Sequence, residues 1–172
     1  MTDSEEWFDV VDAEDRPIGR ALREEVHRRG LRHRAAHILL FDRQGRVFLQ
    51  KRSRTKDMHP GVWDSSAAGH LDAGESYEAA AARELAEELG ADPPPPLRPL
   101  FKLDARPETG WEFVWVYQGE AEGPFRLHPE EIEEGRWFAP EEVDRWIADA
   151  PEDFAPSFLT IWRRFREGSA VS

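Results

Sequence analysis

The chain has 172 residues, of which 40% are hydrophobic and 34% charged, and its formal net charge is −12. This length suits one domain with a sizeable core, since single domains typically run ~100–200 residues. The sequence contains no cysteine, which excludes disulfides, thiolate-zinc sites and a cysteine nucleophile.

The strong negative charge disfavours a nucleic-acid duplex as a partner, because affinity for a duplex comes mainly from Lys and Arg that neutralise phosphates. A small phosphorylated ligand is not excluded, because divalent ions can bridge its phosphates to clustered carboxylates. No apolar run approaches the roughly 20 residues of a membrane helix, and the acidic start of the chain does not resemble a secretory signal. We therefore expect a soluble, cytoplasmic protein, and the oligomeric state stays open.

Turn residues and apolar periodicity divide the first half of the chain into short elements. Gly30 and Gly90 each stand where a helical pattern stops, and glycine suits a helix C-terminus. The segment Asp42–Gly45 has turn chemistry and separates two apolar runs, which predicts a hairpin. In order, the predicted elements are a strand at residues 7–11, a polar turn at 14–17, a helix at 22–29, hairpin strands at 37–41 and 47–50, a short strand at 62–65 and, after a loop, a helix from about 76 to 89.

The second half opens with four consecutive prolines, Pro93–Pro96, which cannot be helical and predict an extended connector. The elements predicted after it are strands at 101–103, 113–117 and 136–138, a helix that begins after Pro140 and an amphipathic helix at about 157–165. Strands and helices alternate with both hairpin and crossover spacings. The pattern predicts an α/β fold in which helices cover both faces of a mixed sheet.

Three glutamates on the predicted helix share one face. Glu84, Glu87 and Glu88 are i, i+3 and i+4 neighbours and fall within roughly 100° of arc. Like charges at these spacings each cost ~0.2–0.5 kcal/mol, so the cluster favours a bound cation. The alternative is an ordinary solvated helix face, in which Arg83 and Glu87 form an i,i+4 ion pair.

The loop before this helix changes the balance between the two interpretations. Gly69 and Gly74 permit tight turns and close approach of the backbone to an ion or ligand, and Glu75 adds a further carboxylate. Hard oxygen ligands from one helix, together with a loop carbonyl such as that of Gly69, suit Mg²⁺ or Mn²⁺ bound jointly with substrate phosphates.

The segment 69–91 resembles the signature of the Nudix family: a glycine, five residues, a glutamate, seven residues and then Arg-Glu-aliphatic-any-Glu-Glu-any-Gly-aliphatic. The fixed positions here are Gly69, Glu75 and the run Arg83–Ala91, in which only Ala91 is smaller than usual. The predicted strand order is also similar to that family's α/β/α sandwich. The resemblance implies a single Nudix-like domain over residues 1–172 that hydrolyses a diphosphate linkage with Mg²⁺, or with Mn²⁺ in its place.

By this resemblance, Glu84, Glu87 and Glu88 bind the divalent ions together with Gly69. Arg83 would hold a glutamate in place by a charge-assisted hydrogen bond. Glu84, Glu87 and Arg83 are therefore the expected catalytic residues. Bound ions would neutralise the phosphate oxygens and help to deprotonate a water near neutral pH.

The general base is not fixed by the motif, because in this family it comes from the motif or from a later loop. Glu112, Glu130 and Glu131 are candidates, and each could equally be a plain surface glutamate.

Residues 49–63 resemble the branch that contains type I isopentenyl diphosphate isomerase. The resemblance implies that Arg52 and Lys56 hold the diphosphate of the substrate. A solvated basic turn is the alternative for both side chains.

The isomerase itself is the main rival to a hydrolase. Its catalytic cysteine directly precedes the motif glycine, where this chain has Ala68, and no cysteine stands elsewhere. His33 and His70 resemble metal ligands of the isomerase, but an isolated histidine is more often a packing residue, so neither is assigned.

A third interpretation is a non-catalytic module that binds a nucleotide. The complete set of motif residues favours a hydrolase over a binder, and nucleoside di- or triphosphates are the expected substrates, ahead of nucleotide sugars and dinucleotides. Four aromatic residues could stack on a base, although aromatics at strand spacing usually belong to the core: Trp63, Trp111, Trp115 and Phe125.

Overall fold

The computed structural model describes residues 6–171, with side chains from residue 6 to residue 168. The chain begins with a two-stranded antiparallel hairpin, β1 (Trp7–Val11) and β2 (Pro17–Leu22), followed by helix α1 (Arg23–Arg29). Strand β1 and helix α1 confirm the sequence prediction, and Gly30 ends α1 in the left-handed conformation with φ 63°. Strand β2 was not predicted, because its exposed residues carry no strand pattern and depend on pairing with β1.

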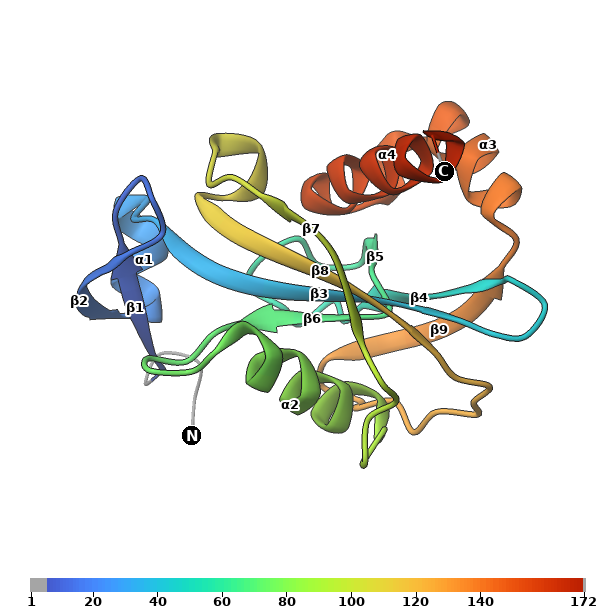
Figure 1. Ribbon diagram of the computed structural model, residues 1–172, viewed down its shortest axis with the longest axis horizontal. Coiled ribbons are helices and arrows are strands. Elements are labelled where there is room, and N and C mark those ends of the chain that lie inside the picture. Colours follow the sequence, from blue (N-terminus) through green and yellow to red (C-terminus); the bar gives the residue numbers. More distant parts are fainter. Residues whose placement is uncertain (1–5, 172) are drawn as a thin grey trace.

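A seven-stranded mixed sheet forms the centre of the molecule (Figure 1). The long strand β3 runs parallel to β8, whereas its other neighbours are antiparallel, so the predicted mixed sheet is confirmed. One edge of β3 is shared, since β6 pairs with its first half and β4 with its end. The strands are β3 (His33–Phe41), β4 (Val47–Arg52), β5 (Trp63–Asp64), β6 (Ala67–His70), β7 (Arg98–Leu103), β8 (Glu112–Glu120) and β9 (Ile132–Phe138).

Helices cover both faces of this sheet, as the sequence predicts. Alternate residues of β3 separate the two layers: Leu39 packs under α3 (Pro140–Asp149) and α4 (Pro156–Val171), whereas Ile38 packs under α2 (Tyr77–Leu89). Figure 1 shows α2 on one side of the sheet and α3 with α4 on the other. The hairpin and α1 lie at one end of the sheet, beside the start of β3.

Helix α2 has the boundaries that its sequence signals indicate. The Ser76 hydroxyl accepts a hydrogen bond from the Ala79 amide at 3.1 Å, and Gly90 ends the helix with φ 68°. Ala81 and Leu85 are fully buried against the sheet. The buried stripe fixes how the helix is rotated, and therefore where its acidic side chains point.

Strand β6 lies in the segment that the sequence predicts to be a loop. Its small residues give no strand pattern, but Ala67–His70 pair with Ala35–Ile38 of β3. The motif glycine therefore lies in a strand of the sheet, next to α2. Within the described residues, no helix is long and apolar enough to cross a membrane.

Candidate active site

An open cleft of about 920 Å³ lies between the N-terminal hairpin, the sheet and α2. It brings together side chains that are far apart in the sequence, from α1 through β4 and α2 to β8. The motif residues at its wall are Gly69, Arg83, Glu84, Glu87 and Glu88.

Glu84 and Glu88 are buried at this wall, with exposed fractions of 8% and 6%. A Cβ atom at Gly69 would lie 2.2 Å from Cδ of Glu84, so only glycine allows this carboxylate to approach β6 so closely. Glu88 Oε1 accepts hydrogen bonds from Gln50 Nε2 at 2.9 Å and from the Ala68 amide at 3.0 Å. Both carboxylates are thus held in fixed positions in the cleft wall.

The two buried acids are electrostatically unfavourable on their own. Burial raises the pKa of Glu84 well above its usual range, and the neighbouring Glu88 charge raises it further. Burial also raises the pKa of Glu88, against the hydrogen bonds from Ala68 and Gln50. Taking carboxylates out of water without enough positive charge is costly, so this pair favours a bound cation. The oxygen donors suit Mg²⁺ or Mn²⁺.

Arg83 connects the motif loop to the motif helix. Its Nε and Nη2 donate to the two oxygens of Glu75 at 2.8 and 2.9 Å, a bidentate pair. Its Nη1 donates to Glu84 Oε1 at 2.5 Å and to Glu87 Oε2 at 3.3 Å. Because Nη2 also donates to the His70 carbonyl at 2.9 Å, Arg83 fixes Glu84 relative to both the loop and β6.

The third glutamate of the face has a different environment. Glu87 has a side chain that is 56% exposed, so solvent reaches this carboxylate although buried Glu88 directly follows it and buried Glu84 lies about one helical turn before it. The shared face inferred from the helical spacing therefore consists of a buried pair and an exposed neighbour at the edge of the cleft.

The two predicted phosphate-binding cations line the cleft, and each already has an acidic or carbonyl partner. Arg52 donates to the carbonyls of Met58 at 2.8 Å and His59 at 3.0 Å and lies 3.5 Å from Asp64. Lys56 forms a close ion pair with Glu131. A phosphate at either cation would share or displace these partners.

The three candidate general bases lie in three different environments. Glu131 lines the cleft and pairs with Lys56. Glu112 lines the cleft but is enclosed by His33 and His70. Glu130 is exposed and lies outside the cleft lining.

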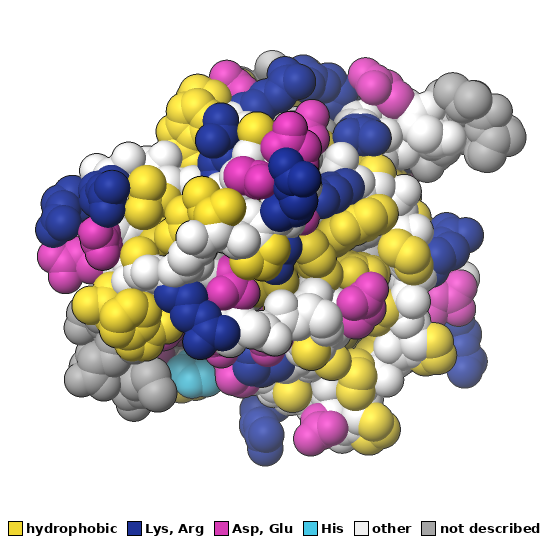
Figure 2. All heavy atoms as spheres, turned by 60° about the vertical axis from the view of Figure 1, so that its left-hand side comes forward, with side chains coloured by type: hydrophobic (Ala, Val, Ile, Leu, Met, Phe, Trp, Pro, Cys, Tyr) yellow, Lys and Arg dark blue, Asp and Glu magenta, His cyan; other side chains and the backbone are white. Residues whose placement is uncertain are grey.

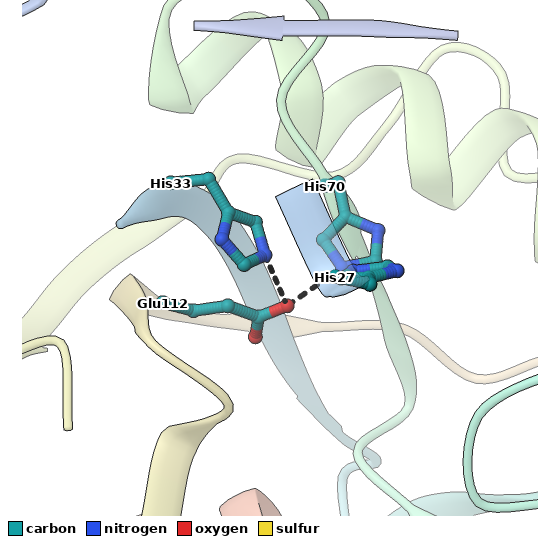
Figure 3. Close-up of side chains that lie close together, drawn as sticks. All are labelled: His27, His33, His70 and Glu112. Atoms are coloured by element: carbon teal, nitrogen blue, oxygen red, sulfur yellow. Dashed lines mark ion pairs between the residues drawn. The ribbon is translucent and has the colours of Figure 1, made fainter. Parts of the chain in front are cut away.

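A second group of potential metal ligands lies at the hairpin end of the cleft, outside the Nudix-like motif (Figure 3). One ligand atom from each of its four members lies within 4.8 Å of all the others. His33 and Glu112 approach from one side and His70 from the other, with His27 of α1 beside it (Figure 3). The members come from α1, β3, β6 and β8: His27, His33, His70 and Glu112.

The protonation of this group fits a cation. His33 Nδ1 lies 2.8 Å from the Leu31 carbonyl and must donate to it, so Nε2 of the neutral ring is a lone pair. That buried Nε2 has no hydrogen-bond partner and lies 3.3 Å from a Glu112 oxygen. Burial lowers the pKa of His70 to about 4, which keeps its imidazole neutral. An unpartnered ring nitrogen that faces a carboxylate oxygen, with two further imidazoles beside it, matches the donor set of a divalent transition ion.

The aromatic residues named from the sequence lie away from the cleft. Trp63 is in the core beneath α3, and Trp115 and Phe125 pack in the layer of α2. Trp111 lies against Gly30. Sequence reasoning missed Trp7, Arg23, His27, Gln50 and Met58, all of which line the cleft.

Comparison with known proteins identifies the family. The model of the NUDIX domain matches residues 31–158. An uncharacterized Nudix hydrolase of Streptomyces coelicolor, SCO1686, is 37% identical over 179 aligned residues, which cover 100% of this chain and 94% of that protein. The uncharacterized Nudix hydrolase YfcD of Escherichia coli is 36% identical, with 98% and 93% covered. The chain therefore belongs to the Nudix family, and it is a hydrolase that acts on diphosphate bonds, a reaction that in this family generally depends on divalent metal ions.

Solved structures show the same fold. The crystal structure of DR0079 from Deinococcus radiodurans is similar with a TM-score of 0.81 and 30% identity, covering 92% of this chain and 98% of that one. The Nudix domain of Shewanella oneidensis NrtR, in complex with ADP ribose, is similar with a TM-score of 0.61 and 20% identity, covering 77% and 85%. The predicted α/β sandwich with a mixed sheet is thereby confirmed.

Proposed function

We propose that the protein is a Mg²⁺-dependent hydrolase of nucleoside di- or triphosphates or related nucleotides. The observation that carries this proposal is the buried pair Glu84 and Glu88, which Gly69, Gln50 and Ala68 hold at the wall of an open cleft. Such a pair favours a bound cation, and its oxygen donors match Mg²⁺, with Mn²⁺ as a substitute.

Each residue of the motif has a role in this proposal. Glu84, Glu87 and Glu88, with the Gly69 carbonyl, would hold the divalent ions. When bound, the ions would neutralise the phosphate oxygens and lower the pKa of an attacking water. Arg83 keeps Glu84 in place through the same guanidinium that binds Glu75.

Outside the motif, two cations and one acid complete the proposed site. Arg52 and Lys56 would bind the phosphates of the substrate. Glu131 is the favoured general base among the three candidates, because it lines the cleft and its charge acts on the pKa of Glu88. When phosphate binds to Lys56, Glu131 would lose its cation and become free to accept a proton.

The rival isomerase activity lacks support in this chain. Ala68 lies in β6 directly before Gly69, where an isomerase would need its cysteine, and the chain contains no cysteine. A nucleotide-binding module without activity would not need the arginine-linked acids of the motif.

The proposed activity is tested by measuring phosphate release from a panel of nucleotides. With Mg²⁺, at least one nucleoside di- or triphosphate should be hydrolysed, activity should vanish in excess EDTA, and it should return when Mg²⁺ or Mn²⁺ is added back. Turnover that persists in excess EDTA would contradict the metal mechanism, and a panel that binds without turnover would favour the binding module.

The second ligand group supports an additional ion. Its three imidazoles and one carboxylate resemble sites for Zn²⁺ or another imidazole-binding transition ion more than sites for Mg²⁺. His33 and His70, left unassigned on sequence grounds, would belong to this second site together with His27 and Glu112.

A further inference from the structure

Two exposed apolar side chains border the same polar cleft. Among the described residues, three large hydrophobic side chains are exposed: Trp7 at 52%, Ile18 at 67% and Met58 at 36%. Trp7 and Met58 line the cleft, whereas Ile18 of the same hairpin does not. Concave ligand sites are lined largely by hydrophobic and aromatic side chains, so apolar groups exposed inside this cleft are candidates for a ligand contact.

Trp7 is held in register with the Nudix motif by its backbone. The Trp7 carbonyl accepts a hydrogen bond from the Ala73 amide at 2.8 Å, within the motif loop. Two residues further along β1, Asp9 Oδ2 accepts from the Gly74 amide, also at 2.8 Å. The indole thus has a fixed position relative to the loop that leads into α2, although its ring remains exposed.

Met58 lies in the loop after β4, and Arg52 holds its backbone in place. Its carbonyl accepts from Arg52 Nη2 at 2.8 Å. The adjacent Asp57 lies 3.2 Å from Arg23 of α1, and this ion pair joins the loop to the N-terminal hairpin and helix. Trp7 thus lies on the hairpin and Met58 on the loop after β4, and the Asp57–Arg23 ion pair connects that loop to α1, which directly follows the hairpin.

The distribution of polarity within the cleft indicates the shape of its ligand. The motif carboxylates, Arg52 and Lys56 line the part beside α2 and β4, where a metal-bound diphosphate would be held, and Trp7 and Met58 are the large exposed apolar side chains of the same lining. A ligand that consisted only of phosphates would make no use of Trp7 and Met58. A nucleoside diphosphate, by contrast, carries a flat ring, and stacking a base on an aromatic side chain stabilises binding without requiring a particular base.

We infer that Trp7 is a substrate-binding residue that stacks on the nucleobase, with Met58 as a second apolar contact for the ring. The inference rests on the proposed function, because it assigns the group beyond the diphosphate in that same site. It also predicts broad tolerance among bases, since stacking uses the face of the base, which all bases share, and not the hydrogen-bonding edges that distinguish them.

The test compares substrates with and without a base. Hydrolysis of ADP, GDP, CDP and UDP is measured beside ribose 5-diphosphate, in Mg²⁺, with Trp7→Ala, Trp7→Phe and the matched control Ile18→Ala. Trp7→Ala should raise KM about tenfold for the four nucleotides, as loss of one stacked base implies. It should leave KM for ribose 5-diphosphate and all kcat values within about twofold, and Trp7→Phe should recover most of the nucleotide affinity.

Binding of the methylene analogue of ADP, measured by calorimetry with Mg²⁺, provides a readout that needs no turnover. If the wild type binds this analogue, Trp7→Ala binds it about tenfold more weakly and no nucleotide is hydrolysed, the stacking inference holds and the proposed hydrolysis fails. Equal effects on nucleotides and ribose 5-diphosphate, no effect on either, or a wild type that does not bind the analogue would each overturn the stacking role of Trp7.

Discussion

At the scale of single residues, the three motif glutamates differ in how much water reaches them. Glu84 and Glu88 lose most of their hydration to the wall of β6, whereas Glu87 keeps more than half of its side-chain exposure. Helical spacing predicts that the three side chains point in a common direction, but it does not predict where β6 lies relative to them. The sequence could therefore identify the acids without showing which of them most requires a cation.

This difference makes Glu84 the most informative position to change. Glu84→Gln keeps the shape of the side chain but removes its charge, so it should lower kcat on the order of 100-fold or more. In metal-free protein it should leave melting unchanged or slightly raised, because one of two mutually repelling buried carboxylates is neutralised. Steady-state kinetics and thermal melting in EDTA measure the two effects.

Glu142→Gln is the matched control for Glu84→Gln. Glu142 is exposed on α3 and its carboxylate accepts a hydrogen bond from the Ala139 amide, which a glutamine oxygen can also accept. The kcat of the Glu142→Gln protein should stay within about twofold of the wild-type value. A Glu84→Gln protein with full activity and sharply reduced melting would place Glu84 in a stabilising ion pair instead.

Arg52 and Lys56 should contribute to binding more than to chemistry. A charge-assisted hydrogen bond contributes ~1.5–3 kcal/mol, so Arg52→Ala and Lys56→Ala should each raise KM about tenfold or more. Arg54→Ala is the control, because Arg54 lies between Arg52 and Lys56 in the chain and its side chain is 76% exposed beside Glu133. If KM stayed constant in both cleft variants, neither cation would bind phosphate.

At the scale of elements, the best predictions came from segments whose local signals agree. Helix α2 has a capping serine, a buried stripe and a terminal glycine, and its predicted and observed boundaries nearly coincide. Strands β2 and β6 have no such signals and were missed, since each exists through pairing with a neighbour. Strand β3 extends four residues before its predicted start, because β8 and β6 pair with that polar beginning.

One largely buried acid, Asp15, helps to attach the N-terminal hairpin to the rest of the fold. Arg34 Nε, Lys102 Nζ and the Tyr77 hydroxyl donate to its carboxylate at 2.6, 2.6 and 2.7 Å. Burial works against ionisation, but these donors outweigh it and lower the pKa of Asp15 below its ordinary value of 3.8. The ionised form is thus bound more strongly in the folded protein than in the unfolded chain.

Asp15→Asn should therefore destabilise the protein by about 2–3 kcal/mol near neutral pH, where two cations would lose their partner. Because the folded pKa is depressed, the stabilisation by Asp15 is complete above the unfolded value near 3.8 and is lost as pH falls through the folded pKa. Urea unfolding of both proteins should show a difference at pH 7 that shrinks below pH 4. Glu14→Gln, at an exposed position of the same turn, should change stability little at either pH.

At the scale of the whole molecule, the cleft is a product of the tertiary fold. Trp7, Arg23 and His27 come from the hairpin and α1, yet they line a cleft whose motif residues begin at Gly69. No local pattern in the sequence connects these segments, so the motif, Arg52 and Lys56 could be predicted, whereas the contribution of the hairpin and α1 could not. Acidic, basic and apolar side chains are interspersed on the face that carries the hairpin, without one continuous basic surface (Figure 2).

The molecule therefore contains two ligand sets of different chemistry, and the last prediction separates them. The carboxylates near α2 should exchange Mg²⁺ readily, because Mg²⁺ keeps several of its waters and binds with few protein ligands. The set of His27, His33, His70 and Glu112 should retain a transition ion through purification, since four preformed donors converge within 4.8 Å. Elemental analysis of dialysed protein should find about one such ion per chain.

Paired substitutions assign that ion to one site. The His33→Ala protein should lose the transition ion, because His33 supplies the buried nitrogen that otherwise has no partner. The rise in melting temperature that the bound ion causes should disappear as well. Glu84→Gln should retain the ion while losing turnover with Mg²⁺. Equal metal content in wild type, His33→Ala and Glu84→Gln would show that the histidines bind no ion, and their arrangement would then serve packing around Phe8 and the hairpin.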